Sequence, residues 1–141
     1  MKKALKRIGL GLLVFIAAIM VYAVLGMGQT LELKLSPVDL SGIPDGSYTG
    51  QYDCYRFSNT VRVAIANGRI ENILSIKGPN GRETIRQDLT DRIIKAQSPA
   101  VDAVSGATAD SKAFLKAVEN SLQTVRFMTD RIREAENEIT P

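Results

Sequence analysis

The sequence contains no histidine, no tryptophan and a single cysteine, Cys54. Histidine and cysteine provide most protein ligands to zinc and haem, so the common ligand sets for both cannot be assembled from this chain. A Ser-His-Asp triad is excluded for the same reason, and one cysteine cannot form an internal disulfide. The chemistry of the protein must therefore come from an organic cofactor, or from carboxylates, hydroxyls, lysine or tyrosine.

Charged residues are also missing from a long stretch near the N-terminus, residues 8–28. At about 1.5 Å per residue, a helix of this length spans roughly 31 Å, the thickness of a hydrocarbon core. Positive flanks stay on the cytoplasmic side, and four basic residues precede the stretch: Lys2, Lys3, Lys6 and Arg7. We therefore predict a single-pass inner-membrane protein with a basic flank and transmembrane anchor at 1–28 and the remainder on the extracytoplasmic side. A cleaved signal peptide is the alternative, because small residues near Ala23 loosely fit a cleavage site.

The charge of the exported part argues against a nucleic-acid partner. The full chain has a formal net charge of +3, and residues 1–28 contain four basic residues and no acid, which leaves −1 for residues 29–141. Domains that bind nucleic acid usually carry a clear positive excess. We therefore expect no nucleic-acid partner.

The pattern of apolar residues predicts a small antiparallel meander. Alternation predicts strands at 47–55 and 60–66. Between the second and third strands, Asn67-Gly68 is a strong signal for a two-residue hairpin turn, because both residues tolerate positive φ. The third strand ends at the turn-forming residues 78–81, and its alternation slips at Asn72-Ile73, which predicts a bulge.

Helical spacing follows the predicted strands. Apolar residues recur at this spacing over 83–97, and a longer apolar stripe starts at about Ala109. These patterns predict an α+β fold: an N-terminal transmembrane helix followed by a small antiparallel three-stranded meander packed with two helices. We place a patternless tether at 29–44, the folded domain at 45–126, and a charged tail that frays at 127–141.

The loop before the last predicted helix consists almost entirely of small residues, Asp-Ala-Val-Ser-Gly-Ala-Thr at 102–108. Small residues let another molecule approach the backbone, and the free N–H groups and positive dipole at a helix start attract phosphate. The hydroxyl of Thr108 would face such a phosphate. Ser, Thr and Asp before a helix are also ordinary N-caps, so capping alone is an alternative explanation of the motif.

With Ser111 and Lys112 after it, this motif resembles the flavinylation motif of the FMN-binding domain in flavin subunits of Rnf complexes and sodium-translocating NADH:quinone reductases. Further segments match that family in order and spacing up to about Leu122. These are the opening strand Asp45–Gly50, the hairpin Asn67–Ile70, the pair Glu83-Thr84, and Ala96-Gln97-Ser98 before the flavin loop. The resemblance therefore covers nearly all of the part of the chain that is expected to fold.

The resemblance implies that Thr108 receives FMN through a phosphoester bond made by a separate, FAD-dependent flavin transferase. It also implies a backbone cradle at Ser105, Gly106 and Ala107, and the further candidate contacts are Asp102, Ser111, Lys112, Tyr55, Glu83 and Thr84. An outside transferase suits the sequence, because a hydroxyl is a poor nucleophile without a base and the chain has no histidine. The flavin would supply the redox chemistry, so we expect an electron-carrier flavoprotein with redox partner proteins rather than an enzyme with its own substrate.

Two other functions fit parts of the sequence. A scaffold or binding module of the same fold would hold FMN non-covalently or not at all. A hydrolase based on a hydroxyl and Lys112 comes last, because Thr108 and Lys112 are four residues apart and serine-lysine acyl enzymes need Ser-x-x-Lys. The sequence also departs from the family pattern after the first strand, where Cys54-Tyr55-Arg56-Phe57 replaces a glycine-rich turn. There, Tyr55 or Phe57 could stack on the flavin ring.

Overall fold

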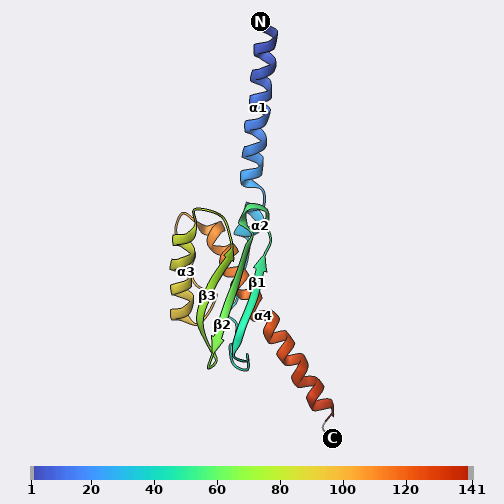
Figure 1. Ribbon diagram of the computed structural model, residues 1–141, viewed down its shortest axis with the longest axis vertical. Coiled ribbons are helices and arrows are strands. Elements are labelled where there is room, and N and C mark those ends of the chain that lie inside the picture. The colour runs from blue at the N-terminus through green and yellow to red at the C-terminus, as the bar shows by residue number, and fades with distance from the viewer. Residues whose placement is uncertain (1, 140–141) are drawn as a thin grey trace.

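The computed structural model describes residues 2–139 of the chain, with side chains for residues 6–139. The side chains of Lys2 and Lys3 in the predicted basic flank, and the last two positions of the predicted tail, lie outside this description. In chain order the elements are α1 (Lys2–Val24), α2 (Met27–Leu31), β1 (Gly46–Tyr52), the 3-10 helix η1 (Tyr55–Phe57), β2 (Asn59–Ala66), β3 (Arg69–Lys77), α3 (Glu83–Ala96) and α4 (Thr108–Ile139) (Figure 1). The fold is α+β, as the sequence predicts.

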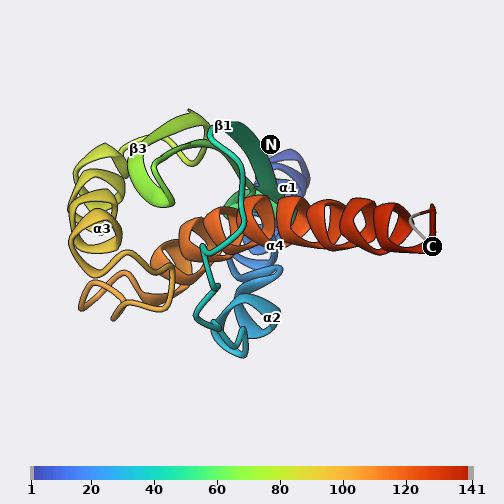
Figure 2. The same cartoon turned by 90° about the horizontal axis from the view of Figure 1, so that it is seen from below.

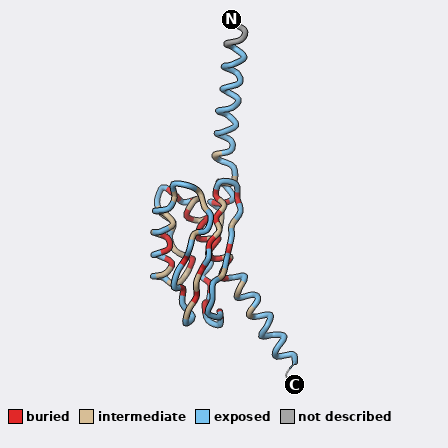
Figure 3. Tube along the Cα trace, in the orientation of Figure 1, coloured by how far each residue is buried: buried red, intermediate tan, exposed pale blue. Residues whose placement is uncertain are grey.

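The N-terminal helix α1 projects away from the domain and is exposed along nearly its whole length (Figure 3). Among the described residues, one helical stretch, Lys6–Leu31, is long and apolar enough by length and composition to cross a membrane. Exposure of so many apolar side chains to water is unfavourable, so this stretch suits a lipid environment. Its length and composition are also compatible with a signal sequence.

Within residues 2–139, β1, β2 and β3 form a single antiparallel sheet in chain order. Asn67 and Gly68 connect β2 to β3 with φ angles of 53° and 69°, which confirms the predicted two-residue hairpin turn. In β3 the pairing with β2 skips Glu71. This bulge lies next to the predicted position, and it brings Ile70 and Ile73 to the same buried face although they are three residues apart.

The core lies between one face of the sheet and α4, while α3 covers β3. Figure 2 shows α4 crossing the sheet, with α3 at its side. The apolar residues that alternate in the second predicted strand are buried in β2. Those that recur at helical spacing in the last predicted helix are buried in α4. The main core residues are Val61, Val63 and Ile65 of β2, Ile70 and Ile73 of β3, Leu89 and Ile93 of α3, and Phe114, Leu115, Val118 and Leu122 of α4.

Gly50 in β1 allows α4 to approach the sheet closely. A Cβ atom at this position would lie 2.3 Å from the carbonyl oxygen of Ala117 and 2.4 Å from the backbone nitrogen of Ser121. Both atoms belong to the backbone of α4, so they cannot move without a shift of the helix. Gly50 therefore sets the distance between β1 and α4.

Gly50→Ala is expected to destabilise the domain by about 2 kcal/mol or more, because the added methyl group forces α4 away from β1. Thermal unfolding of the full-length protein in detergent, followed by circular dichroism, measures the effect. Gly28→Ala is the matched control, because a Cβ at that position meets no atom within 4 Å apart from its chain neighbours and its own helix backbone. Equal melting temperatures for the two variants would contradict the close approach of α4 to β1.

The segment predicted as a tether, residues 29–44, packs against the domain. Thr30 is fully buried, and Val38, Leu40 and Ile43 belong to the hydrophobic core. Apart from the end of α2 the segment has no regular structure. Its apolar residues therefore follow neither a helical nor a strand period, and the sequence pattern does not indicate that they are buried. We call residues 32–44 the strap, because they pass along α4 and contact it at several points.

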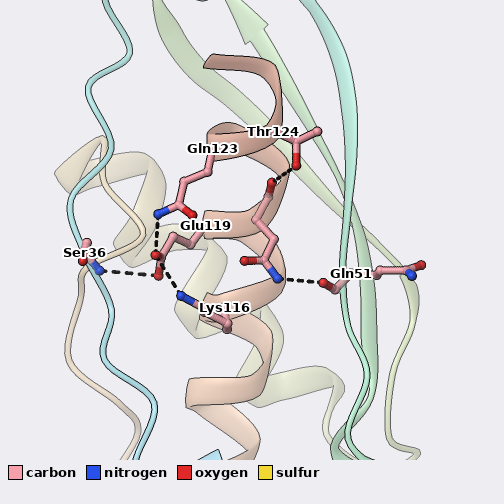
Figure 4. A network of polar contacts seen from close by, with 7 residues as sticks. Ser36, Gln51, Lys116, Glu119, Gln123 and Thr124 are labelled. Carbon is pink, nitrogen blue, oxygen red and sulfur yellow. Dashed lines mark hydrogen bonds and ion pairs between the residues drawn. The ribbon is translucent and has the colours of Figure 1, made fainter. Parts of the chain in front are cut away.

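A buried carboxylate joins the strap to α4 (Figure 4). Glu119 is only 1% exposed, and burial of a charge is costly unless the charge is paired. Its carboxylate accepts hydrogen bonds from Lys116 at 2.9 Å and from Gln123 at 2.7 Å, both on α4. The backbone N–H of Ser36 in the strap donates to it at 3.4 Å. These donors replace the water that Glu119 loses on folding.

Glu119→Ala is expected to cost about 1–3 kcal/mol and to loosen the strap, because the donors around Glu119 lose their common acceptor. Limited digestion with trypsin reports this loosening as faster cleavage after Lys34, which lies in the strap. Glu138→Ala removes an exposed carboxylate from the same helix and serves as the control. If cleavage after Lys34 is equally slow in both variants, Glu119 does not hold the strap.

The last helix is longer than predicted. α4 continues for 32 residues to Ile139, so the tail predicted to fray at 127–141 is helical as far as it is described. This part of α4 projects from the domain at the end opposite α1 (Figure 1). An ion pair between Arg126 and Asp130, one turn apart, supports the exposed helix.

Candidate functional site

The small-residue loop leads directly into α4, which begins at Thr108. Gly106 has a φ of 78°, and the backbone N–H of Ala107 donates to the carbonyl of Val104 at 3.0 Å, which closes a turn before the helix. The backbone N–H of Ser111 donates to the carbonyl of Ala107 at 2.9 Å and starts the helical hydrogen bonds. Thr108 is exposed, so its hydroxyl is not taken up by the core.

A cavity of about 310 Å³ opens beside Thr108. Four parts of the chain supply its lining: Met27 and Leu31 of α2, Arg56 and Phe57 of η1, Arg82 before α3, and Gly106, Ala107, Thr108, Ala109 and Asp110 at the start of α4. Small-molecule sites typically have volumes of about 300–1,000 Å³, so this cavity is at the lower end of that range. The hydroxyl of Thr108 therefore borders a space of ligand size.

Arg56 and Arg82 bring two positive charges to the lining of this cavity and Asp110 one negative charge, which leaves a net charge of +1. The guanidinium of Arg56 lies over the ring of Phe57, 4.5 Å from its centroid, in a cation–π contact. The guanidinium of Arg82 pairs with the carboxylate of Asp110 at 3.3 Å. The positive end of the α4 dipole adds to their effect. Together these features favour an anionic group beside Thr108.

The structure places Asp102 apart from Thr108. Asp102 lines a larger and more open cavity of about 500 Å³, together with Arg92 and Lys95. Its backbone carbonyl accepts a hydrogen bond from Arg92 at 3.4 Å. We assign the functional site to the smaller cavity, because the start of α4 and an aromatic ring from η1 meet there. Ser105 is exposed in the turn and does not line the smaller cavity.

Three other predicted contacts also lie outside this cavity. Glu83 lines a separate cavity of about 270 Å³ and pairs with Arg86 at 3.2 Å, while Thr84 is exposed in the first turn of α3. A hydrogen bond from its own backbone N–H, together with Arg86, lowers the pKa of Glu83. Tyr55 is exposed and its ring packs beside Gly26, where a Cβ would lie 2.9 Å from the ring.

Ser111 and Lys112 do not line the cavity, but they hold the segments that form it. Ser111 is fully buried, and its hydroxyl accepts a hydrogen bond from the backbone N–H of Val104 at 3.0 Å. The ammonium of Lys112 donates to the carbonyls of Leu31 and Leu33, the latter at 3.1 Å. Ser111 therefore holds the loop, and Lys112 holds the end of α2 against α4.

Some lining residues were not predicted from the sequence. Met27 and Leu31 fall at the boundary between the predicted anchor and the predicted tether, where no motif marks them. Arg56 and Arg82 lie next to the predicted contacts Tyr55 and Glu83, in segments that the resemblance already indicated. The structure brings these segments together because β1 and β3 both end at the edge of the sheet where α4 begins (Figure 1).

Comparison with known proteins identifies the family. Residues 57–123 match the family described as FMN-binding domain. The matched residues make up just under half of the chain. This result confirms the family and the cofactor, FMN, that the sequence motifs predicted.

The chain also has a relative in a bacterium. The chain is 33% identical over 94 residues to an "uncharacterized protein" of Treponema pallidum (strain Nichols). The match covers 64% of this chain and 25% of that protein. The chain therefore spans about a quarter of the length of this relative.

The lining of the cavity fits the parts of FMN. An anionic phosphate suits the start of α4 together with Arg56 and Arg82, and Thr108 offers a hydroxyl at that point. An apolar, aromatic ring suits the side of the cavity that Phe57 and α2 form. The FMN-binding domain thus has cationic and apolar lining residues in one cavity.

Ser111→Ala is expected to destabilise the domain by about 1–2 kcal/mol and to free the loop before α4, because the N–H of Val104 loses its acceptor. Amide hydrogen exchange measured by NMR in detergent should be faster at Val104. Ser105→Ala changes an exposed serine in the same loop and is the control. Equal exchange rates at Val104 in both variants would show that Ser111 does not fix the loop.

Proposed function

We propose that this FMN-binding domain carries its FMN covalently, as a phosphoester on Thr108, and passes electrons between redox partner proteins. One observation carries the proposal: Thr108 is exposed at the first residue of α4, on a cavity of ligand size that two arginines line. A threonine that only caps a helix would need neither the cavity nor the arginines.

The bond to Thr108 requires an outside enzyme, a flavin transferase that uses FAD. The hydroxyl oxygen of Thr108 forms a new bond to the phosphorus of the FMN half, the pyrophosphate bond of FAD breaks, and AMP leaves. The hydroxyl proton passes to a base of the transferase. The chain itself offers no histidine for this step, and the carboxylate nearest in sequence, Asp110, pairs with Arg82.

Electron transfer suits the residues around the cavity better than turnover of a substrate. A bound flavin supplies one- and two-electron redox chemistry, and the protein positions the ring. Of the residues that line the cavity, Asp110 is the one carboxylate, and it forms an ion pair with Arg82. The lining therefore supports a carrier of electrons rather than an enzyme with its own substrate.

We further propose that α1 is an uncleaved anchor in the inner membrane, with its N-terminus in the cytoplasm and the FMN-binding domain outside. The apolar stretch Lys6–Leu31 meets the length and composition of a membrane span, and α1 forms this stretch as far as Val24. Basic residues precede it, and no acidic residue occurs in 1–28, which favours this orientation.

Intact mass spectrometry tests the covalent bond. Full-length protein co-expressed with an FAD-dependent flavin transferase is expected to gain the mass of one FMN minus one water, because the FMN half of FAD replaces the hydroxyl hydrogen of Thr108 and AMP leaves. Thr108→Ala should abolish this gain, whereas Thr124→Ala, an exposed threonine on the same helix, should retain it.

Other outcomes separate the alternatives. A protein that is yellow but loses its colour on denaturation and filtration would support a binding module that holds FMN reversibly. A mass gain that persists in Thr108→Ala would contradict the assignment of the phosphoester to this residue.

A further inference from the structure

The short helix α2 forms one wall of the cavity beside Thr108. Met27 and Leu31 lie one helical turn apart, and both side chains line the cavity. Met27 packs against the cluster around Phe57 at the start of α4. Leu31 remains 41% exposed at the rim. An apolar side chain that stays exposed at the edge of a cavity is available to cover an apolar ligand.

Several contacts hold α2 in this position. The hydroxyl of Thr30 donates to the carbonyl of Gly26 at 2.7 Å and lies 3.1 Å from the hydroxyl of Tyr52. Burial raises the pKa of Tyr52. Lys112 of α4 binds the carbonyl of Leu31 at the other end of α2. These contacts make α2 a fixed part of the domain, although it has five residues.

The cavity wall begins directly after the apolar helix α1. Only Leu25 and Gly26 separate α1 from α2. Gly26 has a φ of 78°, and a Cβ there would lie 2.5 Å from the sulfur of Cys54, so the chain turns tightly against the domain at this glycine. Figure 1 shows α2 and the first turns of α4 at the same end of the domain, the end from which α1 extends. The cavity therefore lies at the end of the domain that faces α1.

We propose that Met27 and Leu31 cover one side of the isoalloxazine ring and hold it at the bilayer surface. This inference rests on the proposed phosphoester at Thr108 and on α1 as a membrane span. Arg56 and Arg82 line the cavity together with the start of α4 and suit the phosphate, whereas α2 supplies apolar side chains that suit the ring. Met27 and Leu31 are thus positioning residues for the flavin, contributed by the segment that leaves the membrane.

Quenching of flavin fluorescence by iodide tests whether α2 covers one side of the ring. In loaded full-length protein, the double variant Met27→Ala/Leu31→Ala is expected to raise the Stern–Volmer constant about twofold, because one of the two faces of the ring becomes accessible to water. Met128→Ala/Leu74→Ala is the matched control, since it removes the same atoms from exposed residues that do not line the cavity.

A conservative variant separates positioning from a general loss of structure. Met27→Leu keeps an apolar side chain of similar size, so its quenching constant should equal that of the wild type. If Met27→Ala/Leu31→Ala has the same constant as the control, α2 does not cover the ring and the inference is overturned.

Quenching by lipids tests the location of the ring. Loaded protein in nanodiscs that contain lipids spin-labelled near the headgroup should show weaker flavin emission than in unlabelled nanodiscs. Labels at the ends of the acyl chains should have a smaller effect, because the cavity lies beyond the end of α1. Equal emission in all three kinds of nanodisc would overturn the placement at the bilayer surface.

Intact mass distinguishes this inference from the proposed phosphoester. If the protein gains the mass of FMN but its ring is insensitive to α2 and to lipid labels, the role of α2 is wrong and the phosphoester stands. If the mass gain is absent, the phosphoester is wrong, and the same quenching measurements on reversibly bound FMN still decide the role of α2.

Discussion

The close contact between Gly50 and α4 is the constraint on which the rest of the structure depends. A side chain at this position would collide with the backbone of α4. The absence of a side chain therefore sets the distance between α4 and the sheet. Ser111, one turn into α4, then fixes the preceding loop through the N–H of Val104. The packing of the core thus determines where Thr108 lies and what stands beside it.

The proposed flavin site is assembled from segments that are far apart in the sequence. The start of α4 provides the hydroxyl and the helix dipole, while Arg56 of η1 and Arg82 before α3 add positive charge. α2 adds an apolar wall and is held by Lys112. The strap continues from α2 along α4 and is bound there by Glu119, so the segment between the apolar helix and the sheet is part of the domain.

The sequence predicted the regular elements because their periods are strong. The hairpin at Asn67-Gly68 and the bulge in β3 followed from local patterns, and the motif ending at Thr108 identified the family. The strap and the lining residues Met27 and Arg82 could not be predicted in this way. Their roles depend on contacts with distant elements, and irregular segments leave no period in the sequence. The helical tail was also missed, because its charged residues resemble those of a frayed end.

The central claim is that FMN attached to Thr108 occupies the cavity between the start of α4 and α2. An experimental structure of the loaded, full-length protein in lipid nanodiscs or a lipidic crystal tests it most directly. We predict continuous density from the hydroxyl oxygen of Thr108 through a phosphate to a ring that contacts Leu31. Density for the ring in the larger cavity beside Arg92 and Asp102, or no density joined to Thr108, would contradict the account.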